Sequence, residues 1–459
     1  MRVTIGIDVA VRAAHQASLA DGQGVFLFTG HRFSTDPSEL AGLWSRLPEG
    51  ADDVVVIMEP TRNAWVPLAS WFRGKGARVV MVPPQRSADL RAYYSKHAKT
   101  DRLDSRVLAR LPLLHPEGLH VELGLGPGDA LKRAVKLRCS LVTRRCANMR
   151  RIDALLEIMG PAWTRALGSD LCATALEFVA HYAQPAATRR LGRARLTRFL
   201  RLHSRGRWGE READALLAAA DTTLELWGEG GLDLDALAAD IALEARLACD
   251  LTREIRDLSG RIEVMYRIAD PGGILLSVPG VAVTLAAQIL GRLGDVGRFD
   301  SLAGVRSFSG LVPRHRLSGT GGATGGPSKA GDACLRAALF LAADHARRQD
   351  PQLAARYHRL MTQAGKHHTS ALCSVAAVLL TRIAACLRDG IPYVIRDVDG
   401  RAVGRQEARA ICVERYTVSD AVRAARRTVS RNKSIKGRDG ATQQGVAKRS
   451  DVAPVPVPA

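Results

Sequence analysis

The chain has 459 residues, of which 46% are hydrophobic and 24% are charged, a composition that excludes a disordered chain. It is also too long for one ordinary hydrophobic core, so two or three domains are expected. Its 66 Lys and Arg residues outnumber its 46 Asp and Glu residues and give a net charge of +20, which favours a polyanionic partner such as nucleic acid or an acidic membrane surface.

Hydrophobic patterning at the start of the chain predicts three successive strands, at residues 2–10, 15–20 and 25–33, with a hairpin turn at 21–24. A helix at 37–47, an uninterrupted apolar strand at 53–58, a helix at 62–74 and a fifth strand at 78–82 follow. Helices are expected from there to about residue 114. Three strands followed by alternating helix and strand is the RNase H-like order. No G-x-G-x-x-G follows the first strand, which argues against a Rossmann fold.

Four carboxylates stand out in this part of the chain. Asp8 ends the apolar run of the first strand and Glu59 directly follows the fourth, at positions that face the ligand-binding crevice of α/β sheets. Asp101 and Asp104 are three residues apart, so a helix would place them on one face, although Asp104 alone also fits an ordinary helix surface. Converging oxygen ligands suit Mg²⁺, and two such ions can clamp a phosphodiester.

The middle of the chain is predicted to be helical. Apolar residues recur at helical spacing over 129–159, with many arginines and lysines between them, and a second long helix is expected over about 235–268. The pair suggests an antiparallel, coiled-coil-like hairpin around the Arg-rich, Gly-interrupted segment 160–232. An ordinary helix with a solvated face explains the first of these patterns equally well.

A further module begins at residue 272 and is predicted to be mainly α-helical. Residues 275–282 and 285–290 resemble a helix-hairpin-helix that presents backbone N–H groups to phosphate, and a plain helix–turn–helix packing element fits as well. The longest apolar run, 371–387, contains Ser374 and Arg382 and therefore predicts a buried helix rather than a membrane span. Beyond Thr417 a basic tail without apolar periodicity is expected to be disordered and to contact nucleic acid nonspecifically.

A second cluster of reactive residues lies in the glycine-rich segment 306–336, which carries Arg314, His315, Arg316 and Lys329 beside Ser309, Ser318 and Ser328. Clustered cations stabilise charge on a phosphoryl group, and a serine attacking phosphorus would form a covalent intermediate. His315, a metal-bound oxygen or a distant carboxylate would accept its proton. A disordered basic loop contacting the nucleic-acid backbone remains open, as does Ser328 as the N-cap of a helix starting near Lys329.

The eight cysteines include no C-x-x-C pair, and Cys139 and Cys146 have no histidine nearby in sequence. Neither a zinc site nor a disulfide framework is expected in such a chain. The chain opens directly on a strand, without a signal-peptide pattern. These features predict a soluble cytoplasmic protein without membrane contact, associated with the bacterial nucleoid if it binds DNA.

Two motif sets occur in order along the chain. The first is Asp8, Glu59-Pro-Thr and Lys-Thr-Asp101-x-x-Asp104-Ser. The second is Val-Pro-Gly, Gly-Leu-Val-Pro, Ser318-Gly, Ser-Lys-Ala-Gly and Leu-Arg. Over roughly residues 1–115 and 270–395 this pattern resembles the insertion-sequence transposases with a RuvC-like Asp-Glu-Asp-Asp domain, a family that includes the Piv/MooV DNA invertases.

The resemblance implies an α/β RNase H-like (RuvC-like) domain at 1–115, a helical spacer at 116–270, a transposase domain at 271–416 and the basic tail at 417–459. It implies a Mg²⁺-dependent DNA recombinase in which the acids hold the metal and Ser318 is the nucleophile. Nucleic-acid contacts are expected from Arg314, Arg316, Lys329 and Arg336. The resemblance further implies a noncoding bridge RNA that selects donor and target DNA, and homodimers pairing into tetramers, in which the acids of one protomer complete the serine site of another. This chain is longer than the family's compact members, which supply the bridge-RNA expectation.

Two other functions compete with a recombinase. In a Holliday-junction-type nuclease, water would attack the phosphate and Ser318 would only contact the backbone. A noncatalytic nucleic-acid-binding scaffold is disfavoured, because four acids in a basic protein would then only weaken binding.

Overall fold

Two compact units make up the protein, Met1–Gly126 and Pro127–Ala459. The structure is a computed structural model that describes residues 1–82, 101–114, 116, 119–122, 128–168, 170–228, 230–318 and 321–426. Of residues 101, 120, 314–318 and 321–326 it describes the backbone alone. The four-part division expected from the sequence stays a prediction.

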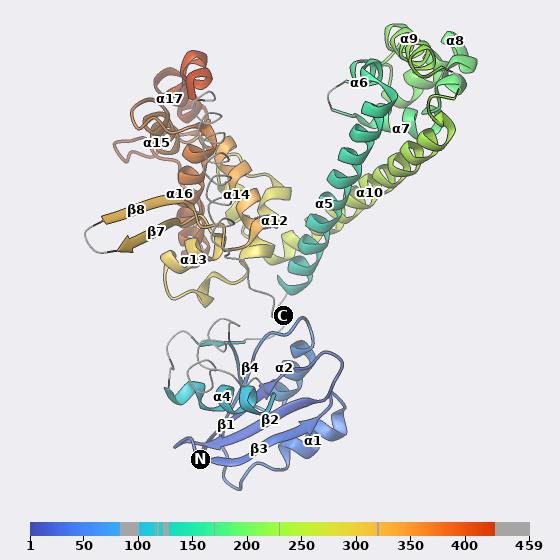
Figure 1. The fold of residues 1–459 in the computed structure, drawn as a ribbon. Helices are drawn as coiled ribbons and strands as arrows, with labels where there is room; N and C mark the ends of the chain where they lie inside the picture. Colours follow the sequence, from blue (N-terminus) through green and yellow to red (C-terminus); the bar gives the residue numbers. More distant parts are fainter. Residues whose placement is uncertain are drawn as a thin grey trace, which may run out of the picture. The chain divides into compact units, whose positions relative to one another are not determined.

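A mixed β-sheet forms the centre of the first unit, in the order β3-β2-β1-β4-β5-β6 (Figure 1). The strands are β1 (Arg2–Asp8), β2 (His15–Asp21), β3 (Phe26–Phe33), β4 (Asp53–Met58), β5 (Arg78–Met81) and the short β6 (His120–Val121). The first three strands are antiparallel neighbours, whereas β4 is parallel to both β1 and β5. The five predicted strands are confirmed, and their arrangement is consistent with the expected RNase H-like order. β6, which pairs antiparallel with β5, was not predicted.

Helices cover both faces of this sheet. On one face, α1 (Pro37–Trp44) and α2 (Trp65–Gly74) place Leu40 and Phe72 in a core with alternate residues of β1 and β4, such as Ile5 and Val56. On the other face, α4 (Asp101–Leu114) packs Leu108 and Leu111 against the intervening residues of β4 and β5. The uninterrupted apolar sequence of β4 follows from this position, because both of its faces are buried. The helices expected before residue 101 lie outside the described residues.

Two long helices begin and end the first half of the second unit. The helices α5 (Gly128–Met159) and α10 (Leu234–Ala269) run antiparallel. Residues farther along α5 form hydrogen bonds with residues progressively nearer the start of α10. Arg138 Nε donates to Ser259 Oγ at 2.9 Å, Arg145 Nε donates to Thr252 Oγ1 at 2.8 Å, and Asn148 bonds Glu244. The predicted helical hairpin is therefore present. Between its arms lie α6 (Pro161–Leu167), α7 (Ala173–Tyr182), α8 (Pro185–Ser204) and α9 (Glu210–Trp227).

This hairpin joins two separate hydrophobic cores. One contains Ile152 and Leu156 from the end of α5, Ile241 from the start of α10, and the buried Trp163 and Phe178 of α6 and α7. The other contains the opposite ends of both long helices. The pair α5–α10 therefore connects two groups of helices (Figure 1). One group is α6–α9, which with the adjoining ends of α5 and α10 forms what we call the terminal helical core; the other is the C-terminal helices, which form the C-terminal core.

The C-terminal helices are α11 (Ile274–Ser277), α12 (Val283–Leu293), α13 (Leu302–Ser309), α14 (Ala333–Ala346), α15 (Pro351–Thr362), α16 (His368–Asp389) and α17 (Arg405–Tyr416), with a 3-10 turn at Val296–Arg298. By length and composition α16 is apolar enough to cross a membrane. In the structure it packs Leu372, Val375, Leu379 and Ile383 into the C-terminal core, as predicted for a buried helix. Gly280 lies between α11 and α12, in the predicted helix-hairpin-helix, and has φ +74°. An added Cβ at Gly280 would lie 2.5 Å from Cβ of His345, so this turn packs against the end of α14.

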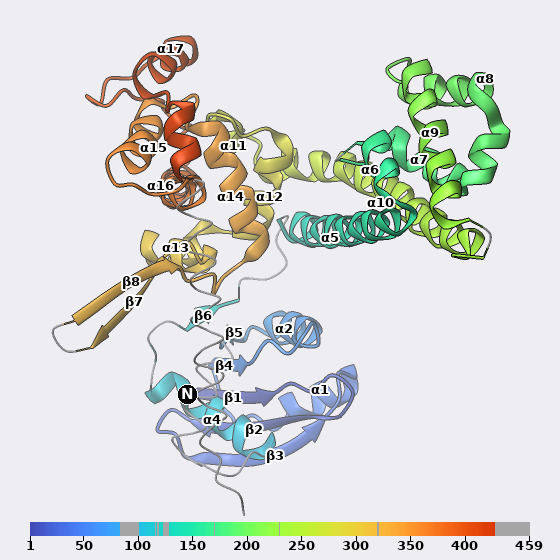
Figure 2. The same cartoon turned by 45° about the horizontal axis from the view of Figure 1, so that its top comes forward.

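Two features differ from expectation. The glycine-rich segment contains β7 (Pro313–Ser318) and β8 (Gly321–Pro327), an antiparallel ribbon that extends away from the helices around it (Figure 2). The expected tail begins with ordered residues, since Val418 is buried in the C-terminal core and Arg426 Nε donates to the Met361 carbonyl oxygen at 3.2 Å. Residues 427–459, which hold most of the basic tail, lie outside the described residues.

Candidate active site

Asp8 and Glu59 occupy equivalent places at the ends of neighbouring parallel strands. In the β1–β4 pair Gly6 lies opposite Ile57 and Ile7 lies opposite Met58, and the two acids are the next residues of each chain segment. Both are partly exposed, whereas the residues before them in the strands are buried. The carboxyl ends of parallel strands meet at one edge of a sheet, so the sequence-based expectation that these two acids share an edge agrees with the strand register.

Helix α4 lies directly against β1 next to this edge. A Cβ added to Gly6 would be 2.2 Å from both the Ser105 carbonyl oxygen and the Ala109 nitrogen, so only glycine permits this approach. Ser105 Oγ also meets Ser18 Oγ of β2 at 2.8 Å in a buried hydrogen bond. The position of α4 is therefore fixed by backbone contact at a point two residues before Asp8.

The direction of α4 follows from its polar contacts with the hairpin of β2 and β3. Arg110 Nε donates to the Gly24 carbonyl oxygen at 3.1 Å, beside the start of β1. About two helical turns earlier, Arg102 Nη2 donates to Thr29 Oγ1 at 2.8 Å, farther along the sheet. α4 thus runs antiparallel to β1, and its first turn, which includes Asp104, lies toward the end of β1 that carries the acid.

The described carboxylates do not complete a metal site by themselves. Among the side chains that the structure describes, no three His, Cys, Asp or Glu groups lie close enough together to hold a metal ion. The side chain of Asp101 is not among them. Asp8 and Glu59 at this edge and Asp104 in the first turn of α4 all carry carboxylate oxygens, the kind of donor that a hard divalent cation prefers.

The segment that follows Asp8 is held by a residue that sequence reasoning missed. His15 Nδ1 accepts the Ala10 N–H at 3.1 Å, and its Nε2 lies 2.9 Å from Thr35 Oγ1. Because Nδ1 is an acceptor, the ring is neutral, and burial lowers the pKa of His15 below its usual value. An alternating strand pattern alone contains no signal for this role.

The three candidate serines occupy different environments. Ser309 is fully buried at the end of α13, and its Oγ donates to the Arg306 carbonyl oxygen at 2.7 Å. Ser328 follows β8, where its Oγ lies 3.4 Å from the Gly310 carbonyl oxygen. Ser318 is the last residue of β7 and lies opposite Gly321, so it is at the closed end of the ribbon. Of the three, burial removes Ser309 from consideration as a nucleophile.

The base of the ribbon is a close-packed crossing of backbone. A Cβ at Gly331 would lie 2.5 Å from the Gly310 nitrogen, so the chain entering β7 touches the chain leaving β8. Arg336 Nη1 donates to the carbonyl oxygens of Ser309 at 3.1 Å and of Lys329 at 3.5 Å. Arg336, expected to contact nucleic acid, thus also joins the two backbone segments at the ribbon's base.

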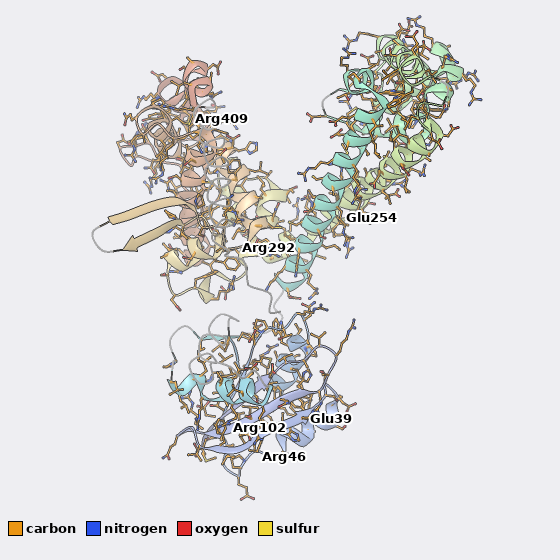
Figure 3. The ribbon with its side chains drawn as sticks, viewed as in Figure 1. Glu39, Arg46, Arg102, Glu254, Arg292 and Arg409 are labelled. Atoms are coloured by element: carbon orange, nitrogen blue, oxygen red, sulfur yellow. The ribbon has the colours of Figure 1, made fainter. Side chains whose placement is uncertain are left out.

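The helix after the ribbon begins later than expected. Its N-cap is Asp332, whose Oδ1 accepts the Leu335 N–H at 2.8 Å, so the alternative in which Ser328 caps this helix is wrong. Arg292, at the end of α12 (Figure 3), donates to Asp332 Oδ2 through Nε at 2.8 Å. The acidic N-cap is therefore both a helix signal and the partner of a half-buried arginine.

Known protein families match both motif-bearing parts of the chain. A family described as transposase matches residues 5–161, and the transposase family IS116/IS110/IS902 matches residues 272–358. The chain is 30% identical to the uncharacterized 43.6 kDa protein of insertion element IS110 of Streptomyces coelicolor, over 86% of this chain and 96% of that relative. It is 29% identical to the 42 kDa protein of IS900 of Mycobacterium paratuberculosis, over 85% of this chain and 97% of that relative.

The match in the first unit covers the Asp-Glu-Asp-Asp part of the family, and a nuclease domain of this kind implies a divalent metal. The match over residues 272–358 covers the ribbon, α14 and the first part of α15. Similarity to the insertion-element proteins extends through the helices between. The chain belongs to the IS116/IS110/IS902 family of transposases, which are DNA phosphoryl-transfer enzymes.

Proposed function

We propose that this transposase, with a RuvC-like first domain, cuts and rejoins DNA through a covalent link between Ser318 and the scissile phosphate. The acids Asp8, Glu59, Asp101 and Asp104 would hold Mg²⁺, which supplies positive charge to the phosphate when bound. The observation that carries the proposal is the register of β1 and β4, which brings Asp8 and Glu59 to one edge of the sheet. The position of Ser318 at the closed end of a projecting ribbon supports the second half of the proposal.

The serine step conserves the number of phosphoester bonds. The Ser318 oxygen forms a bond to phosphorus while one P–O bond to deoxyribose breaks, and the serine proton ends on the leaving deoxyribose oxygen. A deoxyribose hydroxyl of another strand then attacks the phosphoserine, releases Ser318 and receives its bond to phosphorus. Strand exchange by this route needs no external energy source.

The cations of the ribbon would neutralise charge that develops on the phosphate during both steps. Arg314 and Arg316 are on β7, and Lys329 directly follows Ser328 at the end of the ribbon. Positions 316 and 318 are two apart along β7 and so belong to one face of the ribbon, whereas position 315 belongs to the other. This pattern favours Arg316 over His315 as the functional neighbour of Ser318.

Guidance by a noncoding bridge RNA, assembly as homodimers or homotetramers, and association with the nucleoid belong to the same proposal. They are supported by the resemblance in motif order and, for RNA, by the net charge of +20. In such an assembly the acids of one protomer would act with the serine of another. The proposed domain limits are 1–115, 116–270, 271–416 and 417–459.

The test is to trap the covalent intermediate on a DNA substrate nicked near the element's end, so that the leaving strand diffuses away. Wild-type protein and Ser328→Ala should form a protein–DNA adduct, whereas Ser318→Ala should form none. The acidic edge by itself supports a second function, a Holliday-junction-type nuclease that uses water. Cleavage that persists in Ser318→Ala, without an adduct in the wild type, would establish that function instead.

A further inference from the structure

The terminal helical core carries arginines that the active site does not use. Helix α8 has arginines at positions 189, 190, 193, 195, 198 and 201 and no acidic residue. The helix is interrupted at Gly192, whose φ of 71° is non-helical, so residues 193–204 form a separate straight segment. Its two sides have different surroundings.

One side of this segment is neutralised within the protein by α9. Arg193 bonds Asp214 at 2.6 Å and Glu210 at 2.9 Å, and Arg201 lies 3.6 Å from Glu210. These ion pairs orient α8 on α9. They leave little positive charge for an external ligand.

The other side presents arginine without a carboxylate. Arg195 and Arg198 are exposed, and in the described part of the chain neither lies in an ion pair. The Arg195 guanidinium donates to the carbonyl oxygens of Leu191 at 3.0 Å and of Arg190 at 3.2 Å, which holds it at the helix surface. Positive charge is thus concentrated on one side of the helix.

Aromatic and apolar groups share this side with the arginines. Phe199 lies against His203 with ring centroids 4.3 Å apart and ring planes tilted by 34°, and it meets Tyr182 of α7 edge-on at 5.1 Å. Leu202, in the next helical turn after Arg198, is 75% exposed. We call this surface the α8 face; its members recur at helical spacing and are Arg195, Arg198, Phe199, Leu202 and His203.

We infer that the α8 face binds an unpaired strand of DNA. Arginines without a carboxylate partner complement phosphates, and partly exposed rings offer stacking surfaces for bases that are not already stacked in a duplex. A duplex would use the arginines but not Phe199 or Leu202, because its base faces are occupied. DNA is the substrate on which this family acts, so the inference rests on the family's activity and not on Ser318.

The test uses the full-length protein and a thymidine oligonucleotide of about 20 nucleotides, followed by fluorescence anisotropy at several salt concentrations. Arg195→Gln with Arg198→Gln should weaken binding several-fold. The plot of log K against log salt concentration should also become less steep by about 1.4, since each phosphate contact on a single strand contributes about 0.7 to its slope. The matched control is Arg253→Gln with Arg256→Gln on α10. Those arginines pair with Asp250 and Asp257, so the same loss of charge should leave binding unchanged.

Stacking is tested separately by photocrosslinking with 5-iododeoxyuridine in the same oligonucleotide. Crosslinks should map to Phe199 or His203, and Phe199→Leu, which keeps an apolar side chain against the core, should reduce them several-fold. His203→Ala should also reduce the crosslinks, and because His203 is exposed this change should not disturb packing. The inference would be overturned if the crosslinks mapped only to other helices. It would also be overturned if duplex DNA competed as well as single-stranded DNA, or if the protein bound RNA and not DNA.

Discussion

His15 couples the pH of the medium to the segment that follows Asp8. Its folded-state pKa lies below the ordinary value of 6.5 because the ring is buried, and its Nδ1 must stay unprotonated to accept the Ala10 N–H. The unfolded chain therefore takes up the proton first as pH falls. The contribution of His15 to stability is fully present above about pH 6.5 and decreases as pH falls below that value toward the folded-state pKa.

His15→Gln should reveal this contribution as a pH-dependent difference in the free energy of unfolding. Denaturant unfolding of wild type and variant at pH 7.5 should show the wild type as the more stable protein, and the gap should narrow toward pH 5. Comparison with the variant is needed because burial also lowers the pKa of His31 and His368. A gap that stays constant over this range would contradict the neutral, buried role of His15.

The cysteines should differ strongly in reactivity. Burial raises the pKa of Cys139 to about 12 and that of Cys412 to about 12, whereas Cys146 and Cys172 are exposed. Since the thiolate is the nucleophile, iodoacetamide at pH 8 should label Cys146 and Cys172 well before the other two. Peptide mass spectrometry over a time course checks this, and early labelling of Cys412 would show that the C-terminal core opens readily.

Some residues of the site could be found from sequence and others could not. Asp8 and Glu59 are detectable because a carboxylate at the end of a buried strand needs a reason to be there. His15 and Arg336 carry no such signal. The strand register brings the Ala10 N–H to His15, and the contact of Gly310 with Gly331 brings the Ser309 carbonyl oxygen to Arg336.

At the scale of elements, the contact between α4 and β1 depends on one glycine. Gly6→Ala would place a methyl group 2.2 Å from backbone atoms of α4, which cannot move without shifting the helix that bears Asp104. We expect destabilisation by about 1–3 kcal/mol and a loss of DNA cleavage. Thermal unfolding and a cleavage assay on the same sample measure both effects.

Gly22→Ala, in the turn between β2 and β3, provides the matched control. There an added Cβ would lie 3.6 Å from the Arg2 carbonyl oxygen, an ordinary contact, so a change within about 0.5 kcal/mol and normal cleavage are expected. If Gly6→Ala were as harmless as Gly22→Ala, the packing of α4 would not position the acids.

Elements with a strong hydrophobic period were predictable, and those without one were not. The strands β1 to β5, the helical hairpin of α5 with α10, and the buried helix α16 all have apolar residues at the spacing of their structure. The ribbon of β7 and β8 has the sequence Pro-Arg-His-Arg-Leu-Ser paired with Gly-Gly-Ala-Thr-Gly-Gly-Pro, in which apolar and polar residues do not alternate along the strands. Its strands arise from backbone pairing, so the segment gave the pattern of a loop.

At the scale of the whole molecule, the second unit contains two cores that share α5 and α10. The terminal core draws on the end of α5 and the start of α10, whereas the C-terminal core draws on Leu131, Val135, Leu258 and Ile262 from the opposite ends. Each core can therefore lose stability without direct loss of contacts in the other.

Replacing residues 160–232 with a short Gly-Ser linker should show this independence. The remaining ends of α5 and α10 should lose protection from hydrogen exchange, because Ile152, Leu156 and Ile241 lose their partners in α6–α9. Protection of α14 and α16 should be unchanged. Fast exchange in α16 of this variant would mean that the two cores fold as one.

The central claim is that the acids of the first unit and the serine of the ribbon perform one reaction. The most direct measurement is mass spectrometry of the peptide linked to DNA after trapping, for the wild type and for Asp8→Asn with the fold verified by circular dichroism. The account predicts a phosphoserine at residue 318 in the wild type and no adduct in Asp8→Asn. An adduct of undiminished yield in Asp8→Asn, or one attached to another residue, would contradict it.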